Sequence, residues 1–268
     1  MINFDTKTHG FCERMLYGGY PPEYINAFTS LFLTFSGLMG LFASNNVNTL
    51  GKIYYASFVV NGIGSFGYHW TNYIGWRYID EFSMVILALA SLLSVTNCLI
   101  NKICLHKHWR KSSMYSISTL IIVSYLIITL VFDSLDDVIS FRYSFGVFLA
   151  VAAIEVSILT YLNRDIKSDI LKYNYIGFGL IALSCIMWSF IELLCYNQST
   201  AWVKYIPGHA IWHIGLSFGG YYLAQIIDYI TALDLDCYPK FITTSWYQKL
   251  YPKIDCESKN YFYYGLLD

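Results

Sequence analysis

Long apolar stretches, separated by short polar connections, run along most of the chain. Seven of them are long enough to cross a bilayer as a helix, which takes roughly 17–25 residues. Because the connections are short, we expect helices that follow each other in sequence to be neighbours in space. The pattern therefore predicts an all-α fold, an integral membrane seven-helix bundle, with helices near residues 24–43, 50–71, 79–100, 115–132, 141–161, 174–196 and 207–230.

The last part of the chain differs from these stretches in its density of aromatic residues. We expect residues 1–230 to form the membrane domain and residues 231–268 to form a C-terminal tail. The tail should lie at the membrane interface or in solvent, without a catalytic role. Its aromatic residues are Trp246, Tyr247, Tyr251, Tyr261, Phe262, Tyr263 and Tyr264.

The distribution of lysine and arginine predicts how the bundle is oriented. The connections after the first, third and fifth helices, together with the tail, carry twelve of these residues, and the other side carries five. Because cytoplasmic loops hold the excess of positive charge, the N-terminus is expected on the lumenal or extracellular side and the C-terminus in the cytoplasm.

Composition supports the membrane assignment and excludes some classes of function. The chain has 268 residues, of which 56% are hydrophobic and 13% charged, whereas soluble domains carry about 25% charged residues. Its mean hydropathy is +0.45. A net charge of −1 gives no reason to expect nucleic acid as a partner, and the seven cysteines include no Cys-x-x-Cys pair for a thiolate zinc site.

Two histidines near the start of the seventh expected helix are candidate metal ligands. His209 and His213 follow Pro207, a residue that suits the first turn of a helix. Four residues apart, the two imidazoles share one helix face. Neutral imidazoles in such a pair are suitable ligands for zinc.

The predicted topology brings further polar residues to the same lumenal depth. The second helix ends there with Ser65 and His69, which are also four residues apart, and the third begins there with Asp80. Three histidines with an open fourth position are typical of catalytic zinc. Asp80 would accept a proton from water, and Ser65 would donate a hydrogen bond to a developing oxyanion. The alternative interpretation is three separate membrane histidines bonded to backbone, with Asp80 favoured only by the helix dipole.

Acidic residues and cysteines before the first helix offer other interpretations. Glu23 and Asn26, where the first helix enters the bilayer, are either a helix cap and a solvated acid or an oxygen-rich ion site. Cys12 and Cys195 both fall on the lumenal side, where an oxidising compartment permits a disulfide. The intramembrane Glu192 and Glu155 we interpret as members of polar networks.

The ordered set Ser65-x-x-x-His69, Asp80-Glu81 and His209-x-x-x-His213 resembles the alkaline ceramidases. Those are seven-helix zinc amidases of the hydrolase superfamily that includes the adiponectin receptors. The resemblance implies zinc on His69, His209 and His213, catalytic roles for Asp80 and Ser65, and a lumenal disulfide between Cys12 and Cys195. Calcium-sensitive members carry further acids and an Asn; here Gly10 and Met15 stand at those positions, and Glu13 and Glu23 remain as calcium candidates.

The resemblance also implies a function and a location. The expected activity is hydrolysis of the ceramide amide to a sphingoid base and a free fatty acid, in the endoplasmic reticulum or Golgi membrane, with no obligate protein partner. An apolar cavity between helices is expected to hold the acyl chain. One alternative is a lipid-binding receptor-like or scaffold protein of the same fold with little turnover, and another is a transporter or sensor without metal.

Overall fold

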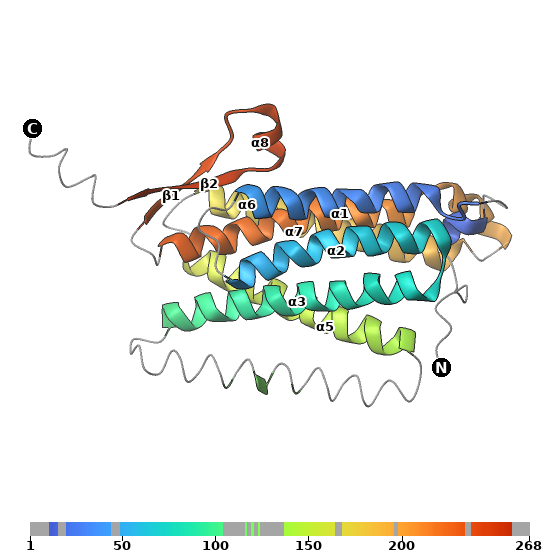
Figure 1. Cartoon of the computed structure of the whole chain (residues 1–268), viewed down its shortest axis with the longest axis horizontal. Helices are drawn as coiled ribbons and strands as arrows, with labels where there is room; N and C mark the ends of the chain where they lie inside the picture. Colours follow the sequence, from blue (N-terminus) through green and yellow to red (C-terminus); the bar gives the residue numbers. More distant parts are fainter. Residues whose placement is uncertain are drawn as a thin grey trace, which may run out of the picture.

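The computed structural model describes residues 11–15, 20–43, 49–103, 137–163, 168–195, 198–233 and 237–258, with isolated positions between 116 and 123. Within these residues, long helices run side by side and a two-stranded hairpin lies at one end (Figure 1). The described part is therefore mostly helical, as predicted. The expected fourth helix, residues 115–132, lies almost entirely outside the described residues.

The long helices agree closely with those expected from the sequence. They are α1 (Tyr24–Ala43), α2 (Thr49–Thr71), α3 (Ile74–Ile103), α5 (Asp137–Leu162), α6 (Ser168–Leu194) and α7 (Gly208–Leu233). The largest differences are at α6, which begins at Ser168 rather than near residue 174, and at α3, which begins at Ile74 rather than near residue 79. Its first turn is held by a tertiary contact, because the ring of Trp76 lies directly against Gly67 of α2.

Close helix packing in the bundle depends on small residues. α2 packs between α1 and α3, and α7 packs against α1 and α6. A side chain at Gly62 of α2 would collide with Thr34 of α1, and one at Gly215 of α7 would collide with Ser184 of α6. Small residues at these crossings let the helix backbones approach each other, as is common between membrane helices.

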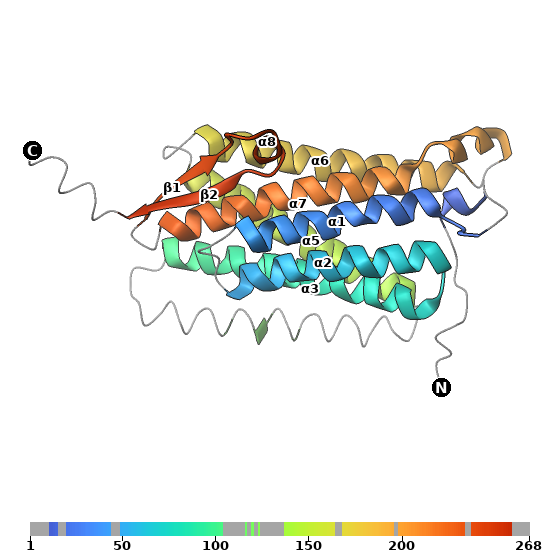
Figure 2. The ribbon, with the colours of Figure 1, turned by 45° about the horizontal axis from the view of Figure 1, so that its top comes forward.

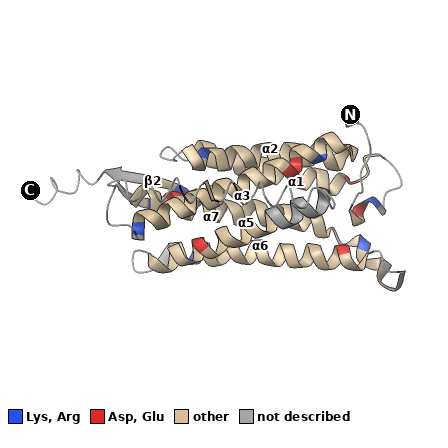
Figure 3. Cartoon of the chain, turned by 90° about the horizontal axis from the view of Figure 1, so that it is seen from below, with Lys and Arg blue, Asp and Glu red and all other residues tan. Residues whose placement is uncertain are grey.

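The long helices differ in how apolar they are. In the described part of the chain, α1, α3, α5 and α6 are long and apolar enough to cross a membrane. The helices α2 and α7 are of similar length, but they bury polar side chains in the interior, including Asn61, His69, His213 and Gln225. Charged residues lie mostly toward the ends of the helices (Figure 3). This arrangement is that of a membrane protein with a polar interior.

Part of the C-terminal tail forms a hairpin that sequence analysis did not predict. Strands β1 (Cys237–Ile242) and β2 (Lys253–Ser258) are antiparallel, with Ile242 opposite Lys253, and a short helix α8 (Trp246–Leu250) lies between them. The hairpin packs on the bundle through Phe241, whose ring stacks on Tyr229 of α7 at 5.0 Å. It lies over one end of the helices in both views (Figures 1 and 2).

Candidate metal centre

Three buried histidines meet where α2 ends and α7 begins. His69 comes from the last turn of α2, and His209 and His213 come from the first two turns of α7. One nitrogen from each ring lies within 4.8 Å of the other two. The convergence predicted from helix topology is therefore confirmed, and the group could hold one metal ion.

The histidine nitrogens show where an ion fits. The Nε2 atom of His69 and the Nδ1 atom of His209 are buried and have no hydrogen-bond partner in the described residues. Leaving a buried polar atom unsatisfied costs about 1–3 kcal/mol. Such a cost at two neighbouring rings is explained when the nitrogens are ligands, so the three residues fit a metal ion such as zinc.

Glu23 holds the other side of the His69 ring. Its Oε2 atom lies 2.6 Å from His69 Nδ1, and both side chains are fully buried. A hydrogen bond from Nδ1–H to a carboxylate fixes the ring so that Nε2 points away from it. Metal-binding histidines commonly have such a carboxylate behind them. Sequence analysis treated Glu23 only as a cap or ion ligand and missed this contact, although the need of His69 for an acceptor was a signal for it.

The orientation of His213 follows from a hydroxyl of α1. Thr29 Oγ1 donates its hydrogen to the carbonyl oxygen of Ile25 at 2.8 Å, and it lies 3.2 Å from His213 Nδ1. Because its one hydrogen is used, the hydroxyl oxygen accepts from Nδ1–H. This assignment by the hydrogen-bond network leaves the lone pair of His213 on Nε2, the nitrogen that faces Ser65 at 3.4 Å.

Asp80 and Ser65 lie beside the histidines, as predicted. Asn61 Nδ2 donates to Asp80 Oδ1 at 2.7 Å and to the Asp80 carbonyl oxygen at 3.1 Å. Ser65 lies one turn further along α2 and is also a hydrogen-bond partner of the Asp80 side chain. The serine therefore connects the carboxylate to His213, and Asn61 fixes the direction in which the carboxylate points.

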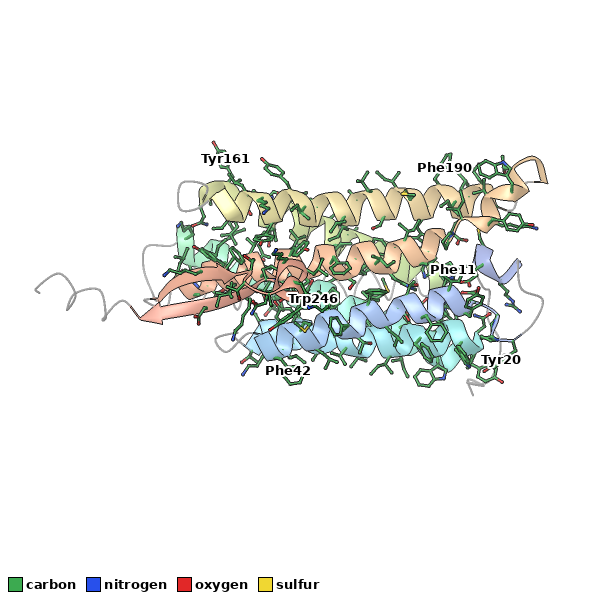
Figure 4. All side chains as sticks on the ribbon, turned by 90° about the horizontal axis from the view of Figure 1, so that it is seen from above. Phe11, Tyr20, Phe42, Tyr161, Phe190 and Trp246 are labelled. Atoms are coloured by element: carbon green, nitrogen blue, oxygen red, sulfur yellow. A yellow bond between two sulfur atoms is a disulfide. The ribbon has the colours of Figure 1, made fainter. Side chains whose placement is uncertain are left out.

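The segment before α1 is tied across this end of the bundle. Cys12 and Cys195 form the expected disulfide, with a Cα–Cα distance of 6.1 Å. The backbone N–H of Cys12 lies 3.3 Å from the Glu192 carboxylate, which places Glu192 in a polar network as predicted. Phe11 is thereby held over the centre, where its ring stacks on His209 at 3.8 Å, a contact that the sequence gave no reason to expect. Phe11 marks this end of the bundle in Figure 4.

The two acids considered for calcium both accept hydrogen bonds from N–H groups. Glu13 accepts from the backbone of Ile25 at 2.7 Å and of Asn26 at 2.9 Å. Burial raises the pKa of Glu13, although these two N–H groups act in the opposite direction. Burial also acts to raise the pKa of Glu23, but His69, with hydrogen bonds from the Phe11 N–H and the Asn26 amide, holds this pKa below its usual value.

These contacts already use both carboxylate oxygens of each acid. The remaining oxygen of Glu23, Oε1, accepts from the Phe11 N–H at 2.7 Å, so every carboxylate oxygen of the pair faces a hydrogen. Asn26 Oδ1 lacks a hydrogen-bond partner in the described residues, but calcium takes 6–8 oxygen ligands. Gly10 lies outside the described residues, as does the side chain of Met15.

An apolar groove of about 550 Å³ runs along the outer face of α2 and α3. Its lining includes Val60 of α2 and Trp76, Ile79 and Phe82 of α3. Ile79 precedes Asp80 in the chain, so the groove borders the centre without lying between the histidines.

Comparison with known proteins gives two matches. The profile of the family described as Ceramidase matches residues 4–255. The protein "Putative alkaline ceramidase dcd3B" of Dictyostelium discoideum is 25% identical over 248 residues, which cover 80% of this chain and 82% of that protein.

Proposed function

Because this chain belongs to the ceramidase family, we propose that it is a zinc-dependent membrane amidase that hydrolyses ceramide to a sphingoid base and a free fatty acid. The observation that carries the proposal is the group of three buried histidines, two with unsatisfied nitrogens, beside a carboxylate and a hydroxyl. Membership in the family implies a lipid substrate, and the apolar helices are consistent with one that stays in the bilayer.

His69, His209 and His213 would hold the zinc. Glu23 supports this role, because its carboxylate accepts a hydrogen bond from His69 Nδ1–H, so that Nε2 remains as the nitrogen that can bind the metal. Bound zinc supplies Lewis acidity, which polarises an amide carbonyl and makes a coordinated water a stronger acid. Imidazole nitrogens are ordinary ligands for this metal, and the pair on α7 has the spacing of one helical turn.

Asp80 and Ser65 would move the proton and steady the developing charge. Asp80 accepts a proton from the attacking water and returns it to the leaving nitrogen. Ser65 donates a hydrogen bond to the substrate oxygen on which negative charge develops. Asn61 supports both roles, since its amide donates to Asp80 and keeps the carboxylate beside Ser65.

We propose that residues 1–230 form the seven-span membrane domain, with α2 and α7 inside the bundle and the fourth span near 115–132. The excess of lysine and arginine at the hairpin end supports a cytoplasmic C-terminus, and the metal centre then lies near the lumenal leaflet. A disulfide at that end supports an oxidising compartment on that side, as in the endoplasmic reticulum or Golgi.

Glu13 and Glu23 are proposed to support the centre rather than to bind calcium. Glu13 caps the start of α1 through Ile25 and Asn26, and Glu23 orients His69. Hydrolysis should therefore not require added calcium.

Metal removal tests the proposed activity. The purified protein in detergent micelles should release fatty acid from ceramide, lose this activity on incubation with a zinc chelator, and regain it when zinc is added. Adding calcium instead of zinc is the matched control and should restore nothing. A metal-free preparation with full activity would contradict the proposal.

A further inference from the structure

The C-terminal hairpin is fixed to the bundle by one buried tyrosine. Tyr251 follows α8 and is 3% exposed, between α1 and α7. Its ring lies 5.3 Å from the ring of Phe35 and 5.0 Å from that of Tyr221, and its hydroxyl accepts a hydrogen bond from Ser36 at 3.2 Å. The next residue, Pro252, accepts a hydrogen bond from the Tyr221 hydroxyl at 3.0 Å.

The other strand of the hairpin is fixed independently. Phe241 of β1 stacks on Tyr229 of α7, and its ring lies 4.8 Å from that of Tyr173 of α6. Because β1 contacts α6 and α7, and the residues just before β2 contact α1 and α7, residues 243–250 have a defined place relative to the bundle.

That place is alongside the helices and not beyond their ends. Ser36 lies seven residues before Ala43, the last residue of α1, which at 1.5 Å per residue is about 10 Å inside the end of the helix. The segment Tyr24–Phe42 is a candidate membrane span, and Phe35 beside Tyr251 is 49% exposed. The hairpin therefore folds back along a helix surface that is expected to face lipid, as α8 does beside the bundle in Figures 1 and 2.

The tip of the hairpin exposes large apolar side chains at this depth. Trp246 is 76% exposed, Tyr247 43% and Leu250 46%. Figure 4 labels Trp246 at the tip of the hairpin. Tryptophan and tyrosine are enriched at the level of the lipid headgroups, where one part of the ring is in an apolar environment and the other meets water.

The tip of the hairpin is also positively charged, as is typical of a surface that contacts anionic lipid. Residues 241–253 include Lys249 and Lys253 and contain no aspartate or glutamate. Lys249 is exposed in α8, between Trp246 and Leu250. A lysine can reach up to the headgroups while its stem stays among apolar groups, and it is attracted to anionic lipid.

We propose that Trp246, Tyr247, Lys249 and Leu250 form a lipid anchor that enters the headgroup region of the bilayer leaflet opposite the metal centre. This inference rests on the membrane topology of the proposed function but not on its chemistry. The occupant of the surface is lipid, with a preference for anionic headgroups because of the two lysines.

Tryptophan quenching tests the anchor in the full chain. The protein and its Trp246→Phe variant are placed in nanodiscs of anionic lipid, with bromine either near the headgroup or at the chain end. The difference between their emission spectra isolates Trp246 from the other six of the seven tryptophans. We expect the emission of Trp246 to be blue-shifted. Bromine near the headgroup should reduce its intensity by about half, and iodide in the water should reduce it little, as for a ring at headgroup level.

Emission typical of water, quenched by iodide and not by bromolipid, would overturn the anchor. Protection from both quenchers, with dimers on cross-linking, would also overturn it, since a second copy or another protein would then cover the tip. The same subtraction with Trp202→Phe, which removes a 64% exposed tryptophan in the 3₁₀-helix Gln198–Tyr205, is the matched control for the method.

Fatty-acid release separates this inference from the proposed function. Trp246→Phe should release fatty acid at the wild-type rate, which shows that the variant is folded. If bromolipid quenches Trp246 but neither protein hydrolyses ceramide, the lipid anchor is supported and the proposed amidase activity is contradicted. If both proteins hydrolyse ceramide but bromolipid does not quench Trp246, the amidase activity is supported and the lipid anchor is contradicted.

Discussion

The two ends of the α2–α7 helix pair differ in the hydrogen bonds that their buried polar side chains make. Away from the metal centre, the Tyr55 hydroxyl donates to Asp228 at 2.8 Å and accepts from Gln225 Nε2 at 2.7 Å, and Gln225 Oε1 is the one atom of this group without a partner in the described residues. At the other end, His69 and His209 have buried nitrogens without partners in the described residues.

The comparison separates stability from function within one pair of helices. Buried polar groups that satisfy each other can hold a fold, whereas neighbouring nitrogens that stay unsatisfied cost free energy that something else must offset. At the histidine end, the metal ion of the proposed function would provide that compensation. Substitutions at the histidine end should then remove metal and activity, and those at the tyrosine end should change stability.

The largest expected effect is the loss of a metal ligand. His213→Ala should lose zinc and lower ceramide hydrolysis by about 1,000-fold or more, since the loss of a supporting residue alone costs 10–100-fold. The matched control is Ser217→Ala, one turn further along the same face of α7, where the buried hydroxyl donates to the carbonyl oxygen of Phe32 at 2.8 Å. The control should keep both zinc and activity. Metal analysis and fatty-acid release measure the two properties.

A smaller effect is expected from removing the proposed proton acceptor. Asp80→Asn should keep zinc but lower kcat by about 100- to 10,000-fold, the usual contribution of general acid–base catalysis. Asp228→Asn changes the carboxylate at the opposite end and should leave kcat unchanged. Equal activity of Asp80→Asn and wild type would support the lipid-binding receptor-like alternative over an enzyme.

The carboxylate behind His69 should affect metal affinity more than chemistry. Glu23→Gln should weaken zinc binding by about 10- to 100-fold and lose activity that excess zinc restores. Glu13→Gln removes the acid that caps α1 and should lower thermal stability with little change in zinc affinity. Competition with a fluorescent zinc chelator measures the affinities. If the two variants had the same affinity, Glu23 would have no special role at His69.

The smallest effect on activity is expected at the tyrosine end. Tyr55→Phe should destabilise the protein by about 1–3 kcal/mol, because Gln225 and Asp228 lose a buried partner. Zinc content and fatty-acid release should stay at wild-type values. Thermal unfolding followed by intrinsic fluorescence measures the first property, and a loss of zinc in this variant would show that the two ends are not independent.

Sequence analysis predicted the parts of the site that helix geometry determines. His209 and His213 share a face because they are one turn apart, and the topology placed His69 and Asp80 at the same end. Their convergence needed only the order and direction of the helices. The disulfide between Cys12 and Cys195 was expected from the same topology and from the family resemblance, and the structure contains it.

The contacts that sequence analysis missed depend on side-chain packing between segments far apart in the chain. The hydrogen bond from His69 to Glu23 and the stacking of Phe11 on His209 join the segment before α1 to α2 and α7. The hairpin was missed for a similar reason. Its strands are held by Phe241 and Tyr251 against the helices, and no local periodicity signals those contacts.

X-ray absorption at the zinc edge, combined with metal analysis, tests the central claim most directly. The purified protein should contain about one zinc per chain, with three nitrogen ligands at about 2.0–2.1 Å, and His69→Ala should lose the metal. Absence of zinc from active protein, or a zinc spectrum that is unchanged in His69→Ala, would contradict the claim that these three histidines hold the ion.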